Sequence, residues 1–181
     1  MELTKAVDNL FLYIPQFKFD AERFLREAGG SSEIFEIKTM DDIKTAVNSY
    51  RMVKYLEIDT HGSSGTIHLE SGFTMDAALI GDWAATNPNF LQKNARILFD
   101  GCSIGEGTRG DNFMDKLAAK LLKGKGGVIG ATTVSNVSVP LLWWTGVYMT
   151  PLSFGRLKIK KYDSNGKLDG SMQVDRHGIG R

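Results

Sequence analysis

The sequence predicts an α/β domain whose central sheet is mostly parallel, with five to six strands and helices on both faces. Short apolar runs bounded by turn residues alternate along the chain with segments whose apolar residues recur at helical spacing. This alternation is typical of parallel sheets covered on both faces, which gives three layers. The length of 181 residues suits one domain and is short for two. We therefore expect a single domain over 1–181, with its core at about 10–133.

Five apolar runs are expected to form the strands of the core: Leu10–Ile14, Ile34–Ile37, Lys54–Asp59, Asn94–Asp100 and Gly126–Thr133. Helices are expected from Phe19 to Ala28, after the N-cap residue Thr39, from about Met75 to Ala85, and from Asp111 to Leu122. In the last helix, Asp111 and Asp115 are expected at the start, where carboxylates interact favourably with the helix dipole.

The segments outside this alternation carry turn and surface signals. The alternating stretch Thr66–Glu70 predicts a surface hairpin. Asn165-Gly166 predicts the turn of a second hairpin within 134–181. The polar, glycine-containing tail from Met172 onward is expected to be loose.

Composition excludes several classes of protein. Lys plus Arg number 22 against 21 Asp plus Glu, so no overall field favours nucleic acid or a membrane surface. The longest apolar stretch, Val139–Met149, is well short of the ~20 residues that span a bilayer. The N-terminus lacks a secretory signal, so we expect a cytoplasmic protein, although an effector secreted by another route fits as well. A single cysteine excludes an internal disulfide and a multi-cysteine metal site, and the oligomeric state stays open.

Two of the expected strands end in residues suited to catalysis. The run KYLEID is followed by THG, which contains His61, and ARILFD is followed by GCS, which contains Cys102. Ligands bind outside the carboxyl ends of parallel strands, so we expect His61 and Cys102 to lie side by side there. A cysteine thiolate attacks carbonyl carbons, needs a histidine to manage protons, and needs backbone N–H groups to stabilise the oxyanion. The glycines next to both residues would let a substrate approach the backbone closely.

These residues resemble the caspase-like cysteine peptidases, a group that includes caspases, metacaspases, separase, clostripain and the gingipains. His61-Gly62 followed by SSGTIHL is similar to the His-Gly, small loop and hairpin of caspases, and GCS stands where this family keeps its nucleophile. The resemblance covers roughly Phe11–Thr133. It implies a caspase-like fold, groove loops after the core, and a cysteine endopeptidase that forms a thioester acyl-enzyme without a metal or organic cofactor. His61 would be the general acid/base and Cys102 the nucleophile, and the N–H groups of Gly62 and Cys102 would form the oxyanion hole.

Two aspartates are candidates for substrate binding, because Asp59 and Asp100 each stand two residues before a candidate catalytic residue. Side chains two apart on a strand point to the same side, so a carboxylate at Asp100 is expected to reach the substrate of Cys102. The Asp-x-Cys spacing also resembles that of clostripain, separase and the metacaspases, which cut after Arg or Lys. Caspases, with Gln-Ala-Cys, cut after Asp. We expect a protein or peptide substrate cut after Arg or Lys, with an internal ion pair, for example to Arg109, as the alternative role of the aspartates.

The same residues allow two other interpretations. GCSIG fits the G-x-S-x-G nucleophile elbow of serine hydrolases, with Ser103 as the nucleophile. The chain order of such a triad requires His177 as the base, and the elbow should pass directly into a helix, whereas the helix is expected only after GEGTRG. A caspase-like domain that has lost activity and serves as a binding or regulatory module is the other alternative, and the presence of both His61 and Cys102 argues for the enzyme.

The remaining candidates are weaker. His68 in the alternating stretch and His177 in the tail are expected to be solvated. No cluster of His, Cys and acidic residues has the spacing of a metal site. Trp143 and Trp144 follow the last strand of the core and are candidates for lining the substrate groove, with core packing as the alternative.

Overall fold

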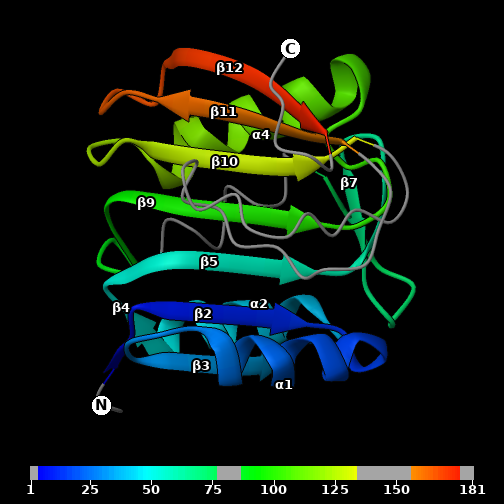
Figure 1. The fold of residues 1–181 in the computed structure, drawn as a ribbon, viewed down its shortest axis with the longest axis vertical. Coiled ribbons are helices and arrows are strands. Elements are labelled where there is room, and N and C mark those ends of the chain that lie inside the picture. Colours follow the sequence, from blue (N-terminus) through cyan, green and yellow to red (C-terminus); the bar gives the residue numbers. More distant parts are fainter. Residues whose placement is uncertain (1–3, 77–86, 134–155, 176–181) are drawn as a thin grey trace.

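A computed structural model describes residues 4–76, 87–133 and 156–175, and these form an α/β structure around a seven-stranded mixed sheet (Figure 1). The strand order is β12-β11-β10-β9-β5-β2-β3. The strands of this sheet are β2 (Asn9–Tyr13), β3 (Ser32–Glu36), β5 (Val53–Asp59), β9 (Leu91–Asp100), β10 (Gly127–Thr132), β11 (Arg156–Tyr162) and β12 (Leu168–Asp175). The five strands from β3 to β10 are parallel, as expected, and their bounds lie within a few residues of the predicted runs.

The prediction of five to six strands was wrong, because the C-terminal hairpin joins the sheet. β11 pairs antiparallel with β10 and β12 with β11. The Asn165-Gly166 turn was predicted correctly, and the positive φ of Gly166 suits it. The tail is not loose from Met172, since β12 continues to Asp175. Lys158 and Lys160 of β11 are not free surface lysines, because they pair with carboxylates of a helix.

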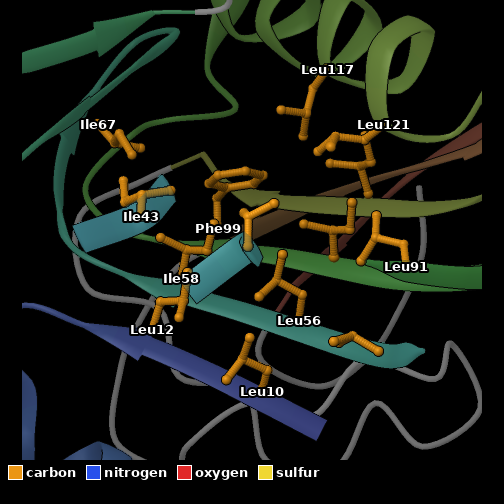
Figure 2. Packing of buried hydrophobic residues seen from close by; sticks show 14 of the residues in the cluster. Leu10, Leu12, Ile43, Leu56, Ile58, Ile67, Leu91, Phe99, Leu117 and Leu121 are labelled. Atoms are coloured by element: carbon orange, nitrogen blue, oxygen red, sulfur yellow. The ribbon is translucent and has the colours of Figure 1, made fainter. Parts of the chain in front are cut away.

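Helices lie on both faces of the sheet. α1 (Lys18–Glu27) packs against one face through Phe24, which shares a buried cluster with Phe11 and Leu98. α2 (Met40–Ser49) and α4 (Gly107–Leu121) pack against the other face in a larger cluster, shown in Figure 2 with Leu56 and Phe99 at its centre. The remaining short elements are β1 (Lys5–Ala6), paired with β4 (Tyr50–Arg51), and the turn η1 (Pro15–Phe17). The side chains of each central strand therefore alternate between the two clusters.

The two helices on the larger cluster begin for different reasons. Thr39 caps α2 as predicted: its hydroxyl accepts from the Asp42 N–H, and the Asp42 carboxylate accepts from the Thr39 N–H in a capping box. α4 begins at Gly107, four residues before the predicted start at Asp111. A Cβ on Gly110 would lie 2.2 Å from the Gly105 carbonyl carbon, so the first turn of α4 packs on the loop that precedes it.

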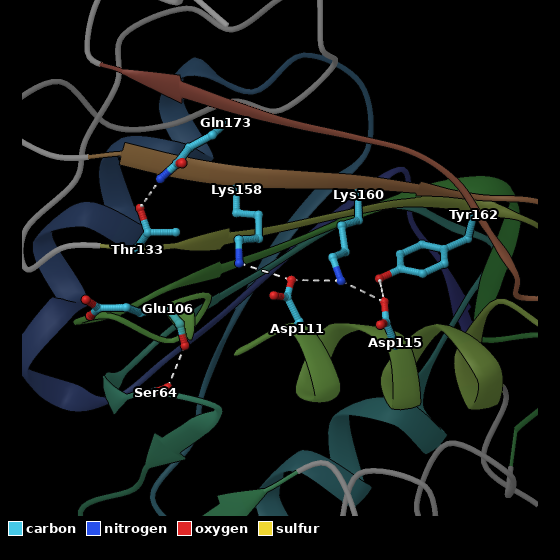
Figure 3. A network of polar contacts seen from close by, with 9 residues as sticks. All are labelled: Ser64, Glu106, Asp111, Asp115, Thr133, Lys158, Lys160, Tyr162 and Gln173. Carbon is cyan, nitrogen blue, oxygen red and sulfur yellow. Dashed lines mark hydrogen bonds and ion pairs between the residues drawn. The ribbon is translucent and has the colours of Figure 1, made fainter. Parts of the chain in front are cut away.

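Asp111 and Asp115 therefore lie inside α4 and not at its start, and they connect the helix to the hairpin. Asp111 lies 3.0 Å from the Lys158 ammonium and 2.9 Å from the Lys160 ammonium, and Figure 3 shows both contacts. Asp115 binds Lys160 at 2.9 Å and accepts from the Tyr162 hydroxyl at 2.8 Å. These contacts fix β11 over the helix.

A separate sheet of three short antiparallel strands follows β5, in addition to the two-stranded β1–β4 pair. It consists of β6 (His61–Ser63), β7 (Thr66–His68) and β8 (Thr74–Asp76). The hairpin predicted at Thr66–Glu70 is present, but the helix predicted to start near Met75 is wrong at its first residues, because Met75 is a buried strand residue opposite Ile67. The rest of that predicted helix lies outside the described residues. No helix in the described part of the chain is long and apolar enough to cross a membrane.

Candidate functional site

The structure places the carboxyl ends of β5 and β9 side by side. Asp59 is the register partner of Asp100, and the Thr60 N–H donates to the Asp100 carbonyl at 3.0 Å. Asp59 and Asp100 lie opposite each other on neighbouring strands, and His61 and Cys102 each follow one of them by two residues. The expectation that these two residues follow adjacent strand ends is confirmed.

Ile104 holds the two strand ends together. A Cβ on Gly62 would lie 2.4 Å from Ile104 Cγ1, and a Cβ on Gly101 would lie 2.8 Å from Ile104 Cδ1 and 2.5 Å from the Thr60 carbonyl oxygen. Ile104 is fully buried. Both positions need glycine because of this packing, which is a different reason from the substrate access expected from the sequence.

The hairpin that begins with His61 is docked on the loop that contains Cys102. The Gly65 N–H donates to the Ile104 carbonyl at 2.9 Å. The Ser64 hydroxyl donates to the Glu106 carbonyl at 2.5 Å, as Figure 3 shows. The two segments thus form one packed unit.

Thr132, at the end of β10, braces the loop from its other side. Its hydroxyl donates to the Gly101 carbonyl and accepts from the Gly101 N–H at 3.3 Å. Its own carbonyl accepts from the Gly105 N–H at 2.6 Å. The residues on both sides of Cys102 are therefore bound to one residue of the neighbouring strand.

Cys102 is half-buried and its thiol is free. Its backbone N–H makes no hydrogen bond to any residue in the described ranges. An unused N–H at a strand end is available for an oxyanion, as the role expected for Cys102 requires.

The His61 side chain is exposed and binds a turn that follows β2. Its Nε2 lies 2.7 Å from the Gln16 Oε1, and its ring meets Phe17 edge-on with centroids 5.4 Å apart. Within 4–76, 87–133 and 156–175, no hydrogen bond joins His61 to Cys102. The structure brings the two strand ends together but does not place the imidazole on the thiol.

Three carboxylates gather beside these strand ends on the face that α1 covers. Glu57 and Asp59 alternate along β5 with Leu56 and Ile58, which belong to the opposite cluster. Burial raises the pKa of Glu57 and of Asp59 well above the usual range, and the charge of Asp100 raises both further. Burial, followed by the charge of Asp20 on α1, raises the pKa of Asp100 to about 7. This cluster favours protonated carboxyls or a cationic ligand.

Internal pairing of these carboxylates is limited. No ion pair joins Asp59 or Asp100 to Arg109 or to any other basic residue that the structure describes, so the alternative of an internal ion pair to Arg109 is not seen there. Glu57 accepts from the Tyr55 hydroxyl at 2.8 Å, but its other oxygen is buried without a hydrogen-bond partner among the residues that the structure describes. The pKa of Glu57 stays raised by burial, because the charge of Arg23 on α1 is only the smallest opposing influence; the Arg23 guanidinium itself ion-pairs with Glu27 at 3.9 Å.

Ser103 has a positive φ of 56°, in the turn between β9 and α4. A serine with positive φ at a strand-to-helix turn is a feature of the nucleophile elbow. The early start of α4 at Gly107 also weakens the objection that the helix begins too late for an elbow. Three residues still separate Ser103 from the helix.

The other candidates fall into two groups. His68 is not simply solvated: it is half-buried, opposite His61 across β6 and β7, and its ring nitrogens lie 2.9 Å from the Ser63 hydroxyl and 3.1 Å from the Thr74 hydroxyl. Trp143, Trp144 and His177 lie outside the described residues. The part of the chain that the structure describes contains no group of three or more His, Cys, Asp or Glu residues that could hold a metal ion.

Sequence reasoning missed three residues of this site. Glu57 has the period-2 spacing that brings it to the side of Asp59, and this signal was present in the sequence. Gln16 follows the end of the first strand, so the rule that selected His61 would have selected it too. Thr132 at the end of β10 gave no signal, because its role depends on side-chain contacts with Gly101.

A profile of a domain of unknown function, DUF4347, matches residues 28–124. The matched segment contains β5, the hairpin of His61, β9, the Cys102 loop and α4. No curated protein and no solved structure matches the chain.

Proposed function

Because the chain belongs to the DUF4347 family, whose function is unknown, we propose a function from the site itself: a caspase-like cysteine endopeptidase that uses His61 and Cys102. The proposal includes the caspase-like three-layer arrangement for the fold. One observation carries it. Two neighbouring parallel strands are each followed, two residues beyond their last residue, by a histidine or a cysteine, and Ile104 and the Asp59–Asp100 register hold these ends together.

The proposed chemistry uses the groups at these strand ends. His61 accepts the Cys102 proton, and the thiolate attacks the scissile carbonyl carbon. The oxyanion accepts a hydrogen bond from the unused Cys102 N–H, with the Gly62 N–H as the second expected donor. His61 then donates its proton to the leaving amine. Water, deprotonated by His61, hydrolyses the thioester and returns the thiol.

The carboxylate cluster supports cleavage after Arg or Lys. Asp100 and Asp59 lie beside the Cys102 loop without ion-pair partners among the described residues, and a guanidinium or ammonium group would supply the missing charge. A neutral side chain would leave the carboxylates uncompensated, and this penalty provides discrimination. Because the pKa of Asp100 is about 7, the preference for a cationic residue should weaken as the pH falls below that value.

A second candidate function is a serine hydrolase that uses Ser103. Its positive φ and the tight packing at Gly101 and Gly105 are the observations in favour. A Cβ on Gly105 would lie 2.8 Å from the Ala131 carbonyl oxygen, so both glycines of the G-x-S-x-G pattern are sterically required. The two candidates share one loop and differ in the nucleophile.

Alkylation and hydrolysis together test the proposal. An isolated thiol is only about 0.3% thiolate at pH 6, so alkylation by a peptidyl-arginine chloromethyl ketone at this pH should require His61. Cys102→Ala and His61→Ala should abolish labelling and lower hydrolysis of Arg and Lys peptides by several orders of magnitude. Ser103→Ala and His68→Ala should retain both.

Three results would contradict this proposal. If Ser103→Ala lost hydrolysis of the peptides and Cys102→Ala kept it, the protein would be a serine hydrolase. Labelling of wild type no faster than a free thiol, with no hydrolysis, would indicate an inactive binding module. Equal rates for Arg, Leu and Asp peptides, or an unchanged preference in Asp100→Asn, would overturn the specificity.

A further inference from the structure

We infer that Gln16 is a positioning residue for His61: it holds the imidazole through Nε2 and leaves Nδ1 free as the base. The inference rests on the proposed cysteine peptidase function. The contact on which it depends is the 2.7 Å hydrogen bond between His61 Nε2 and Gln16 Oε1.

The strand order explains why Gln16 and His61 meet. From β2 the chain moves outward through α1 to β3, and it then returns through α2 on the opposite face to β5 on the other side of β2 (Figure 1). The segment after β2 is α1, on one face, whereas the described segment after β5 contributes Ile67 and Met75 to the cluster on the opposite face, which makes the carboxyl ends of β2 and β5 a topological switch point. In open α/β sheets this is where ligands bind. Gln16 follows β2 and His61 follows β5.

The turn that contains Gln16 is fixed to the strand that leads to His61. The Ile14 N–H donates to the Asp59 carbonyl at 3.2 Å, and the Phe17 N–H donates to the Ile14 carbonyl at 2.8 Å. Pro15 begins the turn, and its ring restricts φ there. Phe17 packs against both hydrophobic clusters. The backbone positions of Gln16 and His61 are therefore fixed relative to each other, and their exposed side chains make the hydrogen bond from these fixed positions.

The chemistry of the contact determines the tautomer. An amide oxygen only accepts hydrogen bonds, so His61 Nε2 carries a proton and, in the neutral ring, Nδ1 holds the lone pair. When Nδ1 takes a proton, Nε2 still donates to Gln16, so the same contact persists through the cycle. Gln16 is neutral and orients the ring without the strong stabilisation of the imidazolium that a carboxylate would give.

Phe17 restricts the ring from a second direction. Its ring meets the imidazole at an interplanar angle of 64°. An exposed histidine otherwise samples several rotamers, and misplacement of a catalytic group by about 1 Å costs up to about 100-fold in rate. Two contacts from one rigid turn limit this freedom.

Two variants of Gln16 separate positioning from a merely structural role. Gln16→Met keeps the size of the side chain and removes the acceptor, so it should lower kcat for Arg peptides by about 10- to 100-fold with little change in KM. Gln16→Glu keeps the acceptor and adds a charge that favours the imidazolium. It should restore most of kcat, shift the acid limb of the pH profile, and move the NMR titration midpoint of the His61 ring up by about one pH unit. Gln92→Met, at the far end of β9, is the matched control and should change nothing.

The NMR titration keeps this inference distinguishable from the proposed function. The positioning role would be overturned if Gln16→Met kept the full kcat. It would also be overturned if Gln16→Glu unfolded at the wild-type temperature and left the titration midpoint of His61 unmoved. If wild type hydrolyses no peptide and its thiol reacts with iodoacetamide like a free cysteine, the peptidase proposal fails. A shifted His61 midpoint in that case would confirm the contact and overturn its part in catalysis.

Discussion

The Asp100→Asn substitution should stabilise the protein, and the gain should grow with pH. The carboxyl of Asp100 has a pKa of about 7 in the folded protein against 3.8 for the ordinary group. Between these values the folded protein holds a proton that the unfolded chain releases. The unfolded state then binds fewer protons, so the free energy of unfolding falls as the pH rises.

The magnitude follows from the size of the shift. A difference of about three pKa units at 1.36 kcal/mol each corresponds to about 4 kcal/mol, developed between about pH 4 and pH 7 and constant above. Asp100 keeps part of its surface exposed and shares its field with Glu57 and Asp59, so we take this figure as an upper bound. Asparagine has nearly the same shape and does not ionise, so it removes this contribution. It should also lower the pKa of both neighbouring carboxyls.

Urea unfolding of both proteins at pH 5, 6, 7 and 8 measures this effect. The difference in the free energy of unfolding should increase steadily from pH 5 to pH 7 and level off near pH 8. Asp169→Asn, at an exposed ion pair between β11 and β12, is the control and should run parallel to wild type. If the free energies of unfolding of wild type and Asp100→Asn changed in parallel with pH, the idea that ionisation of this acid cluster destabilises the folded protein would be refuted.

Three further predictions concern the packing and capping contacts. Gly62→Ala places a Cβ 2.4 Å from the buried Ile104 side chain and should cost about 1–3 kcal/mol in urea unfolding; an unchanged midpoint would mean that Ile104 does not hold the strand ends. Lys160→Ala should lower the unfolding temperature by several degrees, because a nearly buried ammonium between Asp111 and Asp115 is lost, whereas Lys161→Ala at an exposed pair should have little effect. Thr39→Ala should cost about 1 kcal/mol through loss of the α2 cap, and Thr39→Ser should restore most of it, which calorimetry would measure.

The parallel part of the sheet was predictable because its signals are local. Strands such as β2 and β5 are buried on both faces, so they appear in the sequence as short continuous apolar runs. Thr39 followed by Asp42 is a local pattern as well. The adjacency of the strand ends that lead to His61 and Cys102 followed from these elements through the geometry of parallel strands alone.

The parts that could not be predicted depend on tertiary contacts. The GTRG sequence has a poor helix propensity, yet α4 begins there because Gly110 packs on Gly105. Met75 follows a good N-cap residue but lies in β8, since its side chain is buried in the core. The KIKKY sequence of β11 gives no local sign of its ion pairs, and only the position of α4 shows that Lys158 and Lys160 have partners on that helix.

The energetics of the site give the strongest physical reason to place function there. Glycines at 62 and 101, Ile104 and Thr132 give the His61 and Cys102 segments a packed and hydrogen-bonded support, which an active site needs. The same edge of the sheet carries two buried carboxyls, of Glu57 and Asp59, and the half-buried carboxyl of Asp100; their raised pKa values disfavour ionisation, so this region gains nothing in stability from their charge. Leucine or asparagine would fill this space at lower cost, since a core normally excludes unpaired carboxylates. A cationic substrate side chain would remove that cost when it binds, and the stability lost in the free protein would then contribute to selective binding.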